Sequence, residues 1–209
     1  SSWTYNPLKA TIEGDKLVGL GSNDAGASAV SLLATYVNFL NEDLPYNLIV
    51  AITAEEESSG ELNVASILPS LPKIDLGIVG EPTQMDMAIA ERGLVVLDVI
   101  AKGKTGHAAR NEGVNAIYEA IEIMNWFKTY EFDRVSDMLG PVKMTVTQIE
   151  AGKQHNVVPD ECNLVVDCRV NELYSNEELV DIIIKNLPKA VVKARSLRLN
   201  SSRISEDHQ

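Results

Sequence analysis

The 209-residue chain has little that would suit a nucleic-acid or membrane partner. Its 18 lysines and arginines are outnumbered by 30 aspartates and glutamates, which gives a formal net charge of −12. Binding to a phosphate backbone or to an anionic lipid surface needs positive charge on the contact face, so both partners are disfavoured. Nowhere do about 18 apolar residues run together, as a membrane-spanning helix would require. The first residues also lack the basic and apolar regions of a signal peptide, and we expect a soluble, cytoplasmic protein.

Cysteine is scarce as well. Cys162 and Cys168 are the two cysteines of the chain, and they lie six positions apart in a segment that resembles a strand. At roughly 3.3 Å per residue they would lie about 20 Å apart, whereas a disulfide needs Cα atoms within about 7 Å. We therefore expect two free, buried thiols, which is typical of a reducing compartment.

Several common catalytic signatures are missing. Gly103-Lys104-Thr105 is similar to the end of a P-loop, but the first required glycine would fall at Asp98. The sequence has no G-x-S-x-G nucleophile elbow and no H-E-x-x-H zinc motif. Neither cysteine has a second cysteine or a histidine at zinc-finger spacing. These absences disfavour nucleotide-binding, serine-hydrolase and zinc-finger chemistry.

The first part of the chain, residues 1–87, alternates short apolar runs with helical patterns. A helix is expected over residues 28–41, and a second from Ser58 or Ser59 to Leu68. Buried strands are expected over residues 48–52 and 76–79, which are entirely or mainly apolar. This order favours a mostly parallel, doubly wound sheet covered by helices, of the α/β class.

Residues 88–202 have a different pattern of apolar and polar residues. The hydrophobic patterns predict strand, helix, strand, strand, helix, strand over residues 94–100, 113–128, 142–149, 164–170, 175–187 and 191–199. Ser175 and Glu178 form a capping-box signature for the second helix. Antiparallel strands with helices on one face describe an α+β, ferredoxin-like βαββαβ domain. Residues 203–209 would begin a return to the first domain.

Carboxylates follow both expected strands of the first domain. Glu55, Glu56 and Glu57 come just after residues 48–52, Glu81 comes just after residues 76–79, and Asp24 precedes the first helix. Ligands of open α/β sheets bind at the carboxyl ends of the strands. A run such as Glu55–Glu57 on its own is more simply a solvated helix start, but three acidic loops at one edge favour a metal site. Oxygen ligands alone would suit Mg²⁺ or Mn²⁺, whereas zinc would also need imidazole, and this half has no histidine.

The second domain offers three further candidates. His107 lies between small residues in a loop, where an accessible imidazole suits catalysis, although a lone loop histidine is more often a surface residue. Asn156 and Arg169 lie at the two ends of a turn and strand that run from residue 156 to residue 169. An arginine beside a pocket suits a substrate carboxylate, and a salt bridge from Arg169 to Asp167 or Glu172 is an equally good interpretation from spacing alone.

These segments resemble the metallopeptidase family of acetylornithine deacetylase, succinyl-diaminopimelate desuccinylase and glutamate carboxypeptidase. The similar segments are residues 19–26, 53–60, 80–83, 103–109, 156–159 and 167–169, and they span nearly the whole chain in the family's order. The resemblance implies a partial, zinc-peptidase-like catalytic domain over residues 1–87 and a lid or dimerisation domain over residues 88–202. Residues 81–203 are most similar to the acylornithine and acylcitrulline deacylases, which would imply a part in arginine biosynthesis.

By this resemblance, Asp24 bridges two divalent metal ions, usually zinc, with cobalt or manganese as alternatives. Glu56 and Glu81 each complete one ligand set, and Glu55 is the general base. A glutamate at position 81 is similar to the deacylase and carboxypeptidase members. Such a site would lower the pKa of a bridging water and polarise an amide carbonyl.

For the lid, the resemblance implies that His107 reaches the partner subunit's site and steadies the oxyanion, so the protein would be a homodimer. Asn156 and Arg169 would bind substrate. The implied reaction is removal of an acyl group from an N-acyl amino acid such as N-acetylornithine, N-acetylcitrulline or N-succinylornithine. A dipeptidase or aminopeptidase of the same family, and a non-catalytic dimerisation fragment, are the alternatives.

Two histidine ligands of the family are missing from the chain. One, in an H-x-D motif, would precede residue 1, and the other would follow residue 209. We therefore expect an internal stretch of a longer enzyme, which by itself binds metal poorly and is inactive.

Overall fold

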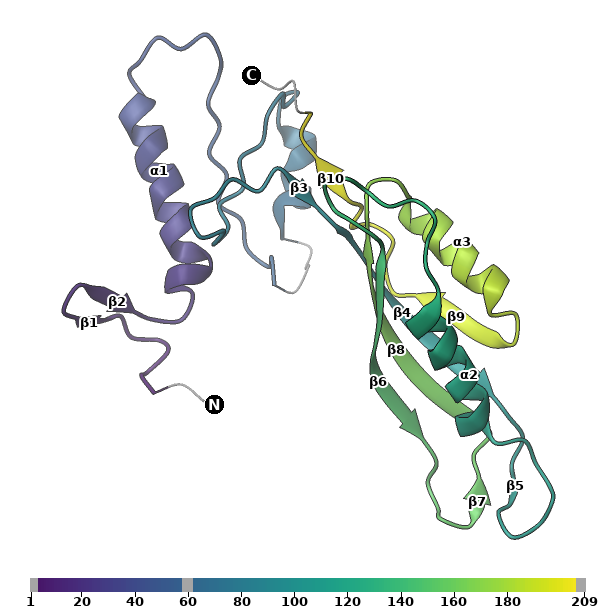
Figure 1. Cartoon of the computed structure of the whole chain (residues 1–209). Coiled ribbons are helices and arrows are strands. Elements are labelled where there is room, and N and C mark those ends of the chain that lie inside the picture. The colour runs from purple at the N-terminus through teal and green to yellow at the C-terminus, as the bar shows by residue number, and fades with distance from the viewer. Residues whose placement is uncertain (1–3, 58–61, 206–209) are drawn as a thin grey trace. The chain divides into compact units, whose positions relative to one another are not determined.

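The computed structural model describes residues 4–57 and 62–205, and it divides into two compact units, Ser1–Met87 and Ala88–Gln209 (Figure 1). Each unit has its own secondary structure. Among the helices that are described, none combines the length and the apolar character needed to cross a membrane.

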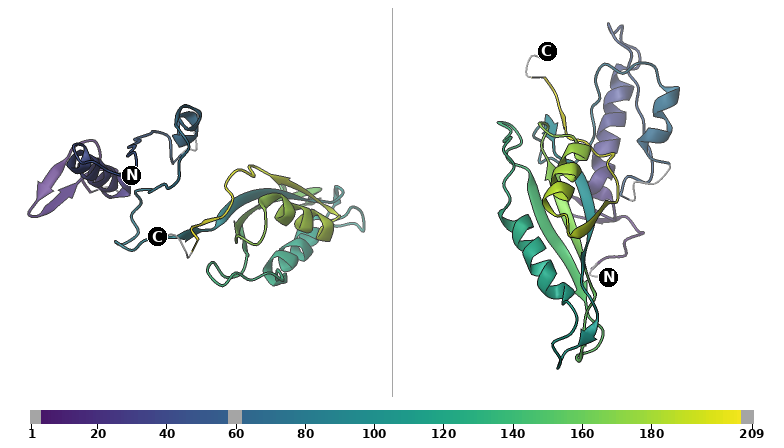
Figure 2. Two further views of the ribbon diagram at one scale, coloured as in Figure 1. Left: turned by 90° about the horizontal axis from the view of Figure 1, so that it is seen from above. Right: turned by 90° about the vertical axis from the view of Figure 1, so that its right-hand side faces the viewer.

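The second unit is built on a four-stranded antiparallel sheet with the strand order β6-β8-β4-β9. Its main elements are β4 (Gly93–Lys102), α2 (Ala116–Thr129), β6 (Lys143–Ala151), β8 (Glu161–Val170), α3 (Asn176–Asn186) and β9 (Ala190–Ala194). Both helices cover the same face of the sheet (Figure 2). The predicted βαββαβ order and ferredoxin-like topology are confirmed.

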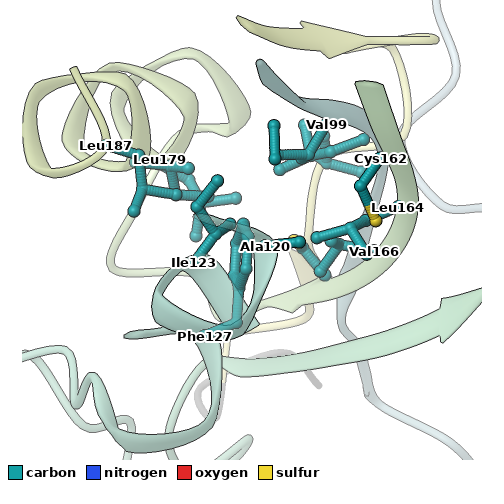
Figure 3. Packing of buried hydrophobic residues seen from close by; sticks show 14 of the residues in the cluster. Val99, Ala120, Ile123, Phe127, Cys162, Leu164, Val166, Leu179 and Leu187 are labelled. Atoms are coloured by element: carbon teal, nitrogen blue, oxygen red, sulfur yellow. The ribbon is translucent and has the colours of Figure 1, made fainter. Parts of the chain in front are cut away.

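The core of this unit lies between the sheet and its two helices (Figure 3). Side chains along β4 alternate between buried and partly exposed, as expected for a sheet covered on one face. The largest fully buried side chains of this core include Val95, Leu97, Val99, Leu164, Val166, Leu179 and Ile183. Each such residue contributes about 1.5–3 kcal/mol through removal from water, so this layer holds the unit together.

Both cysteines belong to this core. Cys162 and Cys168 are free and buried on β8, as the sequence predicts. Burial raises the pKa of the Cys162 thiol. Burial, together with the charge of Asp167, raises the pKa of Cys168 to about 12. Both groups therefore stay protonated at neutral pH and act as small apolar side chains.

The two helices begin at side-chain caps. Ser175 Oγ accepts a hydrogen bond of 3.0 Å from the Glu178 backbone N–H, which confirms the predicted start of α3. The cap of α2 is Asn115, whose Oδ1 accepts from the Ile117 N–H at 2.9 Å. The helix was expected from residue 113, but Gly113 has a φ of +84°, which is incompatible with a right-handed helix. The helix therefore starts after Asn115.

Two short ribbons lie at opposite ends of the four-stranded sheet (Figure 1). At one end β3 (Ala90–Glu91) pairs with β10 (Ser202–Arg203), and at the other β5 (Gly106–His107) pairs with β7 (Val157–Val158). The second ribbon carries His107 and therefore matters for the candidate site.

The first unit contains a hairpin, one long helix and short turns. The hairpin joins β1 (Thr11–Glu13) to β2 (Lys16–Val18), and α1 spans Ala27–Phe39. The helix expected over residues 28–41 is confirmed; it begins one residue earlier and ends two residues earlier than expected. The hairpin was not anticipated, although Gly14, with a φ of +61°, provides the positive φ that its tight turn uses.

The prediction of strands over residues 48–52 and 76–79 is wrong. Both segments are described without strand structure, and their apolar side chains other than Val50 are exposed, to 65% for Ile52 and 80% for Val79. A strand exists only when a neighbour accepts and donates its backbone hydrogen bonds, and no described strand pairs with either segment.

The helix expected from Ser58 or Ser59 to Leu68 is not formed among the described residues. Residues 58–61 lie outside the described residues. Beyond them the chain makes two short 3₁₀ turns, Val64–Ser66 and Leu68–Ser70. Pro69 lies inside the second turn, where it removes a backbone donor and limits a longer helix.

Truncation of the core should identify the layer on which the second unit depends. We expect Leu97→Ala, in the fully buried centre of β4, to lower the free energy of unfolding by about 2–5 kcal/mol. Val191→Ala, on the same sheet but 49% exposed, should cost much less. Denaturant unfolding followed by circular dichroism measures both, and equal losses for the two variants would contradict this account.

Candidate functional site

The first unit brings two of its acidic segments to the start of α1. Asp24 lies in an irregular turn, Ser22–Gly26, directly before the helix. Gly80 passes so close to the helix that an added Cβ would lie 2.9 Å from the Ser28 Cβ and 2.9 Å from the Leu32 Cδ1. Glu81 follows Gly80, so its backbone is next to the first turn of α1. The Asp24 and Glu81 segments therefore converge, and both side chains are exposed.

Glu55 has an unusual backbone conformation. Its φ is +60°, in the left-handed region that residues other than glycine rarely adopt. Its Oε2 accepts a hydrogen bond of 2.9 Å from the Leu62 N–H. Non-glycine residues with such torsions gather at functional sites, which fits a catalytic role. Glu56 follows in an exposed turn.

These acids do not form a complete metal site in the part of the chain that the structure describes. Within residues 4–57 and 62–205 no three histidine, cysteine, aspartate or glutamate side chains are grouped so that they could hold a metal ion. The donor chemistry of Asp24, Glu56 and Glu81 suits a divalent cation, but zinc normally takes imidazole or thiolate ligands as well. The metal ligand set therefore stays a prediction.

His107 and Asn156 lie together at the β5–β7 end of the second unit. His107 pairs with Val157 in the ribbon, and the Ala108 N–H donates to the Asn156 carbonyl oxygen at 3.0 Å. Gly106 is required because an added Cβ would lie 2.4 Å from the Glu112 carbonyl oxygen. Both candidate side chains are exposed at this end.

The hydrogen bonding of His107 determines which ring nitrogen can donate. Its Nδ1 accepts a hydrogen bond of 3.1 Å from the Ala109 backbone N–H. The proton of the neutral ring therefore lies on Nε2. The Nε2–H group is the donor that an acceptor outside the loop would meet, as stabilisation of an oxyanion requires.

Arg169 lies at the other end of β8 and forms an ion pair with Asp167. Arg169 Nε lies 2.8 Å from Asp167 Oδ1, and Nη2 lies 3.1 Å from Oδ2. The hydrogen bonds and charge of Asp167 raise the pKa of Arg169. Of the two salt bridges considered from spacing, the one to Asp167 is formed, because Glu172 instead accepts from Ser136 Oγ at 2.7 Å and faces Arg203.

The length of β8 separates the candidate residues of the second unit. The β5–β7 ribbon, which carries His107 and adjoins Asn156, lies at the start of β8 (Figure 1), whereas Arg169 is the ninth of the ten residues of β8. Nine residues of extended chain measure about 25–30 Å. A single copy of this unit therefore does not bring His107 and Arg169 to one small substrate.

Two features of this unit were missed in the sequence. The first is Lys143, which is the direct register partner of Arg169 across β6 and β8. The second is a cavity of about 570 Å³ beside Glu172 and Arg203. In that cavity the hydrogen bond from Ser136 and the charge of Arg203 lower the pKa of Glu172. Both depend on strand register or loop packing, for which the sequence has no local signal.

Comparison with protein families identifies the second unit. Residues 89–195, just over half of the chain, match the family model described as a peptidase dimerisation domain. The chain belongs to the M20 peptidase family. Members of this family are hydrolases, among them desuccinylases and peptidases.

The curated relatives of this M20 chain include desuccinylases. It is 29% identical over 217 residues to the succinyl-diaminopimelate desuccinylase of Wolbachia pipientis wMel. This alignment covers 96% of this chain and 54% of the relative. The enzyme of the same name from Pelagibacter ubique is 27% identical over 207 residues, covering 93% of this chain and 54% of the relative. The chain thus spans about half the length of the curated relatives it matches.

Solved structures of peptidases share the fold. A tripeptidase from Staphylococcus aureus superposes with a TM-score of 0.66 at 20% identity, covering 96% of this chain and 56% of that chain. Aminopeptidase PepT from Bacillus cereus gives a TM-score of 0.64 at 17% identity, with the same coverage. At these identities the likeness shows the fold alone, and it confirms the mixed α/β class with a dimerisation domain.

Metal content offers a direct check on the incomplete ligand set. We expect the 209-residue chain to retain far less than one zinc ion per chain after dialysis against metal-free buffer, because its acidic candidates supply oxygen ligands only. Elemental analysis by mass spectrometry measures this, and Asp24→Asn is the matched control. One tightly held zinc per chain that is lost in Asp24→Asn would show that the described acids suffice.

Proposed function

We propose that this chain is part of a metal-dependent amidohydrolase that removes an acyl group from an N-acyl amino acid. The observation that carries the proposal is the convergence of the Asp24 and Glu81 segments at the start of α1, in a member of a hydrolase family. The names of the curated relatives make N-succinyl-diaminopimelate the first substrate to test. N-acetylornithine, N-acetylcitrulline and N-succinylornithine follow from the resemblance of residues 81–203 to the acylornithine and acylcitrulline deacylases.

In this proposal the acids of the first unit have separate tasks. Asp24, Glu56 and Glu81 would hold two divalent ions, with zinc, cobalt and manganese as candidates. Bound ions of this kind supply a polarised amide carbonyl and a water of lowered pKa. Glu55 takes the proton of the attacking water and returns it to the leaving amine, as general acid–base catalysis requires.

The second unit would bind the substrate and stabilise developing charge. The side chain of His107 is exposed, and because its Nδ1 is occupied by the Ala109 N–H, its Nε2–H can donate to an oxyanion. Asn156, beside it, offers an amide for a polar group of the substrate. Arg169 can hold a substrate carboxylate through its guanidinium.

We further propose that two copies of the chain pair through β6 to complete each site. β6 is one of the two edge strands of the four-stranded sheet, the other being β9, and an exposed edge is a template for another strand. An apolar groove of about 310 Å³ runs beside it, lined mainly by Met124, Phe127, Met144 and Val146. Apolar surface next to an open edge supports an interface at this position.

Antiparallel pairing of two β6 strands would also bring together the candidate residues that lie at opposite ends of β8. A two-fold axis near the middle of β6 places the Ala151 end of one copy beside the Lys143 end of the other. The β5–β7 ribbon of one copy, with His107 and Asn156, then approaches Arg169 of its partner. The site would be assembled from both subunits.

Two other functions remain to be compared with this proposal. Solved structures named as an aminopeptidase and a tripeptidase favour a peptidase reaction as the second candidate. Turnover of di- and tripeptides against N-acyl amino acids would separate the two. A non-catalytic dimerisation fragment is the third, and it predicts neither metal binding nor turnover in the longer protein.

Glu55 provides the sharpest test of the chemistry. In the complete enzyme, Glu55→Gln should lower kcat by about 10²-fold or more, the usual contribution of a positioned acid–base group, while metal content stays near normal. Glu57→Gln, two residues away and without an assigned role, is the control. Wild-type turnover by Glu55→Gln at full metal content would remove Glu55 from this role.

Assembly through β6 can be tested by light scattering. We expect a dimeric mass at micromolar concentration for the unchanged chain and a monomeric mass for Ile149→Asp, because Ile149 on β6 is 54% exposed beside the edge. Ile184→Asp, on α3 and 46% exposed, should remain dimeric. A monomeric mass for the unchanged chain would contradict the proposed interface.

A further inference from the structure

The face of the sheet opposite the helices places two cations side by side. Lys143 on β6 and Arg169 on β8 are direct partners in the antiparallel register, and both side chains are exposed. Direct partners have Cβ atoms about 4.5–5.5 Å apart, and like charges at that spacing destabilise a sheet. An anion bound between the two side chains would offset this repulsion.

Arg169 is oriented by Asp167 and keeps donors for a ligand. Asp167 accepts from Nε and Nη2 of Arg169, which fixes one side of the guanidinium plane. No described residue accepts from Nη1. A planar guanidinium held in this way can still bind a second carboxylate with its remaining N–H groups.

Lys143 adds a second positive charge to this face. None of the ion pairs among the described residues includes Lys143. At the adjacent register positions, Thr145 lies opposite Asp167 and Leu94 lies opposite Arg169. Glu91 exerts only a weaker electrostatic attraction on Arg169.

We propose that Lys143 and Arg169 together bind one carboxylate of the substrate, with Asp167 as the residue that positions Arg169. Lys143 is then a specificity-determining residue. This inference rests on the proposed function, in which Arg169 contacts substrate. A carboxylate fits better than a phosphate, because Asp167 pairs with Arg169 and Glu91 also attracts it, so the two cations offer too little net positive charge for a doubly charged phosphate.

The test uses the complete enzyme that contains this chain and compares KM with kcat. Lys143→Met should raise KM for an N-acyl amino acid at least tenfold and leave kcat within twofold, since a charge-assisted hydrogen bond to substrate is lost. Lys143→Arg should restore KM to within threefold. Lys193→Met, an exposed lysine on the same face opposite Asp98, is the matched control and should change neither parameter more than twofold.

Substrate analogues show which carboxylate is bound. In one series the carboxylate of the acyl group is replaced by a carboxamide, and in the other the carboxylate of the amino acid is replaced. The analogue that lacks the bound carboxylate should have the same KM with the unchanged enzyme and with Lys143→Met. An active Lys143→Met enzyme with unaltered KM for every substrate would overturn the inference.

Failure of the proposed function would be recognised separately. If the unchanged complete enzyme hydrolyses none of the N-acyl amino acids, the proposed function falls, and titration of the 209-residue chain with succinate decides the inference. Saturable shifts of the Arg169 Nε–H NMR signal that are lost in Lys143→Met and kept in Lys193→Met would support the carboxylate site. Absence of such shifts in the unchanged chain would overturn it.

Discussion

The pairing of β4 with β8 under the two helices is the constraint on which the second unit depends. In the observed register Val95, Leu97 and Val99 lie beside Cys168, Val166 and Leu164, and all six side chains are buried. Side chains of a strand alternate between faces, so a slip of one residue would expose this core and bury the charges. The same register places Asp167 and Arg169 on the face away from the helices. Burial of the core therefore decides the chemistry of the open face.

The strengths and failures of the sequence analysis follow from how local each signal is. Alternation along β4 and β8 and the cap at Ser175 are local patterns, and they predict the second unit well. The start of α2 was missed because the positive φ of Gly113 comes from its loop. The apolar runs 48–52 and 76–79 indicate a need for burial, but a strand also needs a partner, and composition does not provide that information.

The candidate site also has a part that local sequence patterns predict and a part that depends on contacts between distant segments. Asp24, Glu55, Glu56, Glu81, His107, Asn156 and Arg169 were selected from motifs and from their places next to expected strands. The approach of the Asp24 and Glu81 segments depends on the close contact of Gly80 with α1, which no spacing in the sequence indicates. The pairing of Lys143 with Arg169 joins residues far apart in the chain and becomes visible only with the sheet register.

The distance between His107 and Arg169 along β8 has a consequence for how activity would respond to the amount of protein. If each site needs His107 from one copy and Arg169 from the other, a dissociated chain has no complete site. Specific activity would then fall on dilution below the dissociation constant of the dimer, following mass action. The concentration of the chain would itself control the rate of catalysis, without any regulatory ligand.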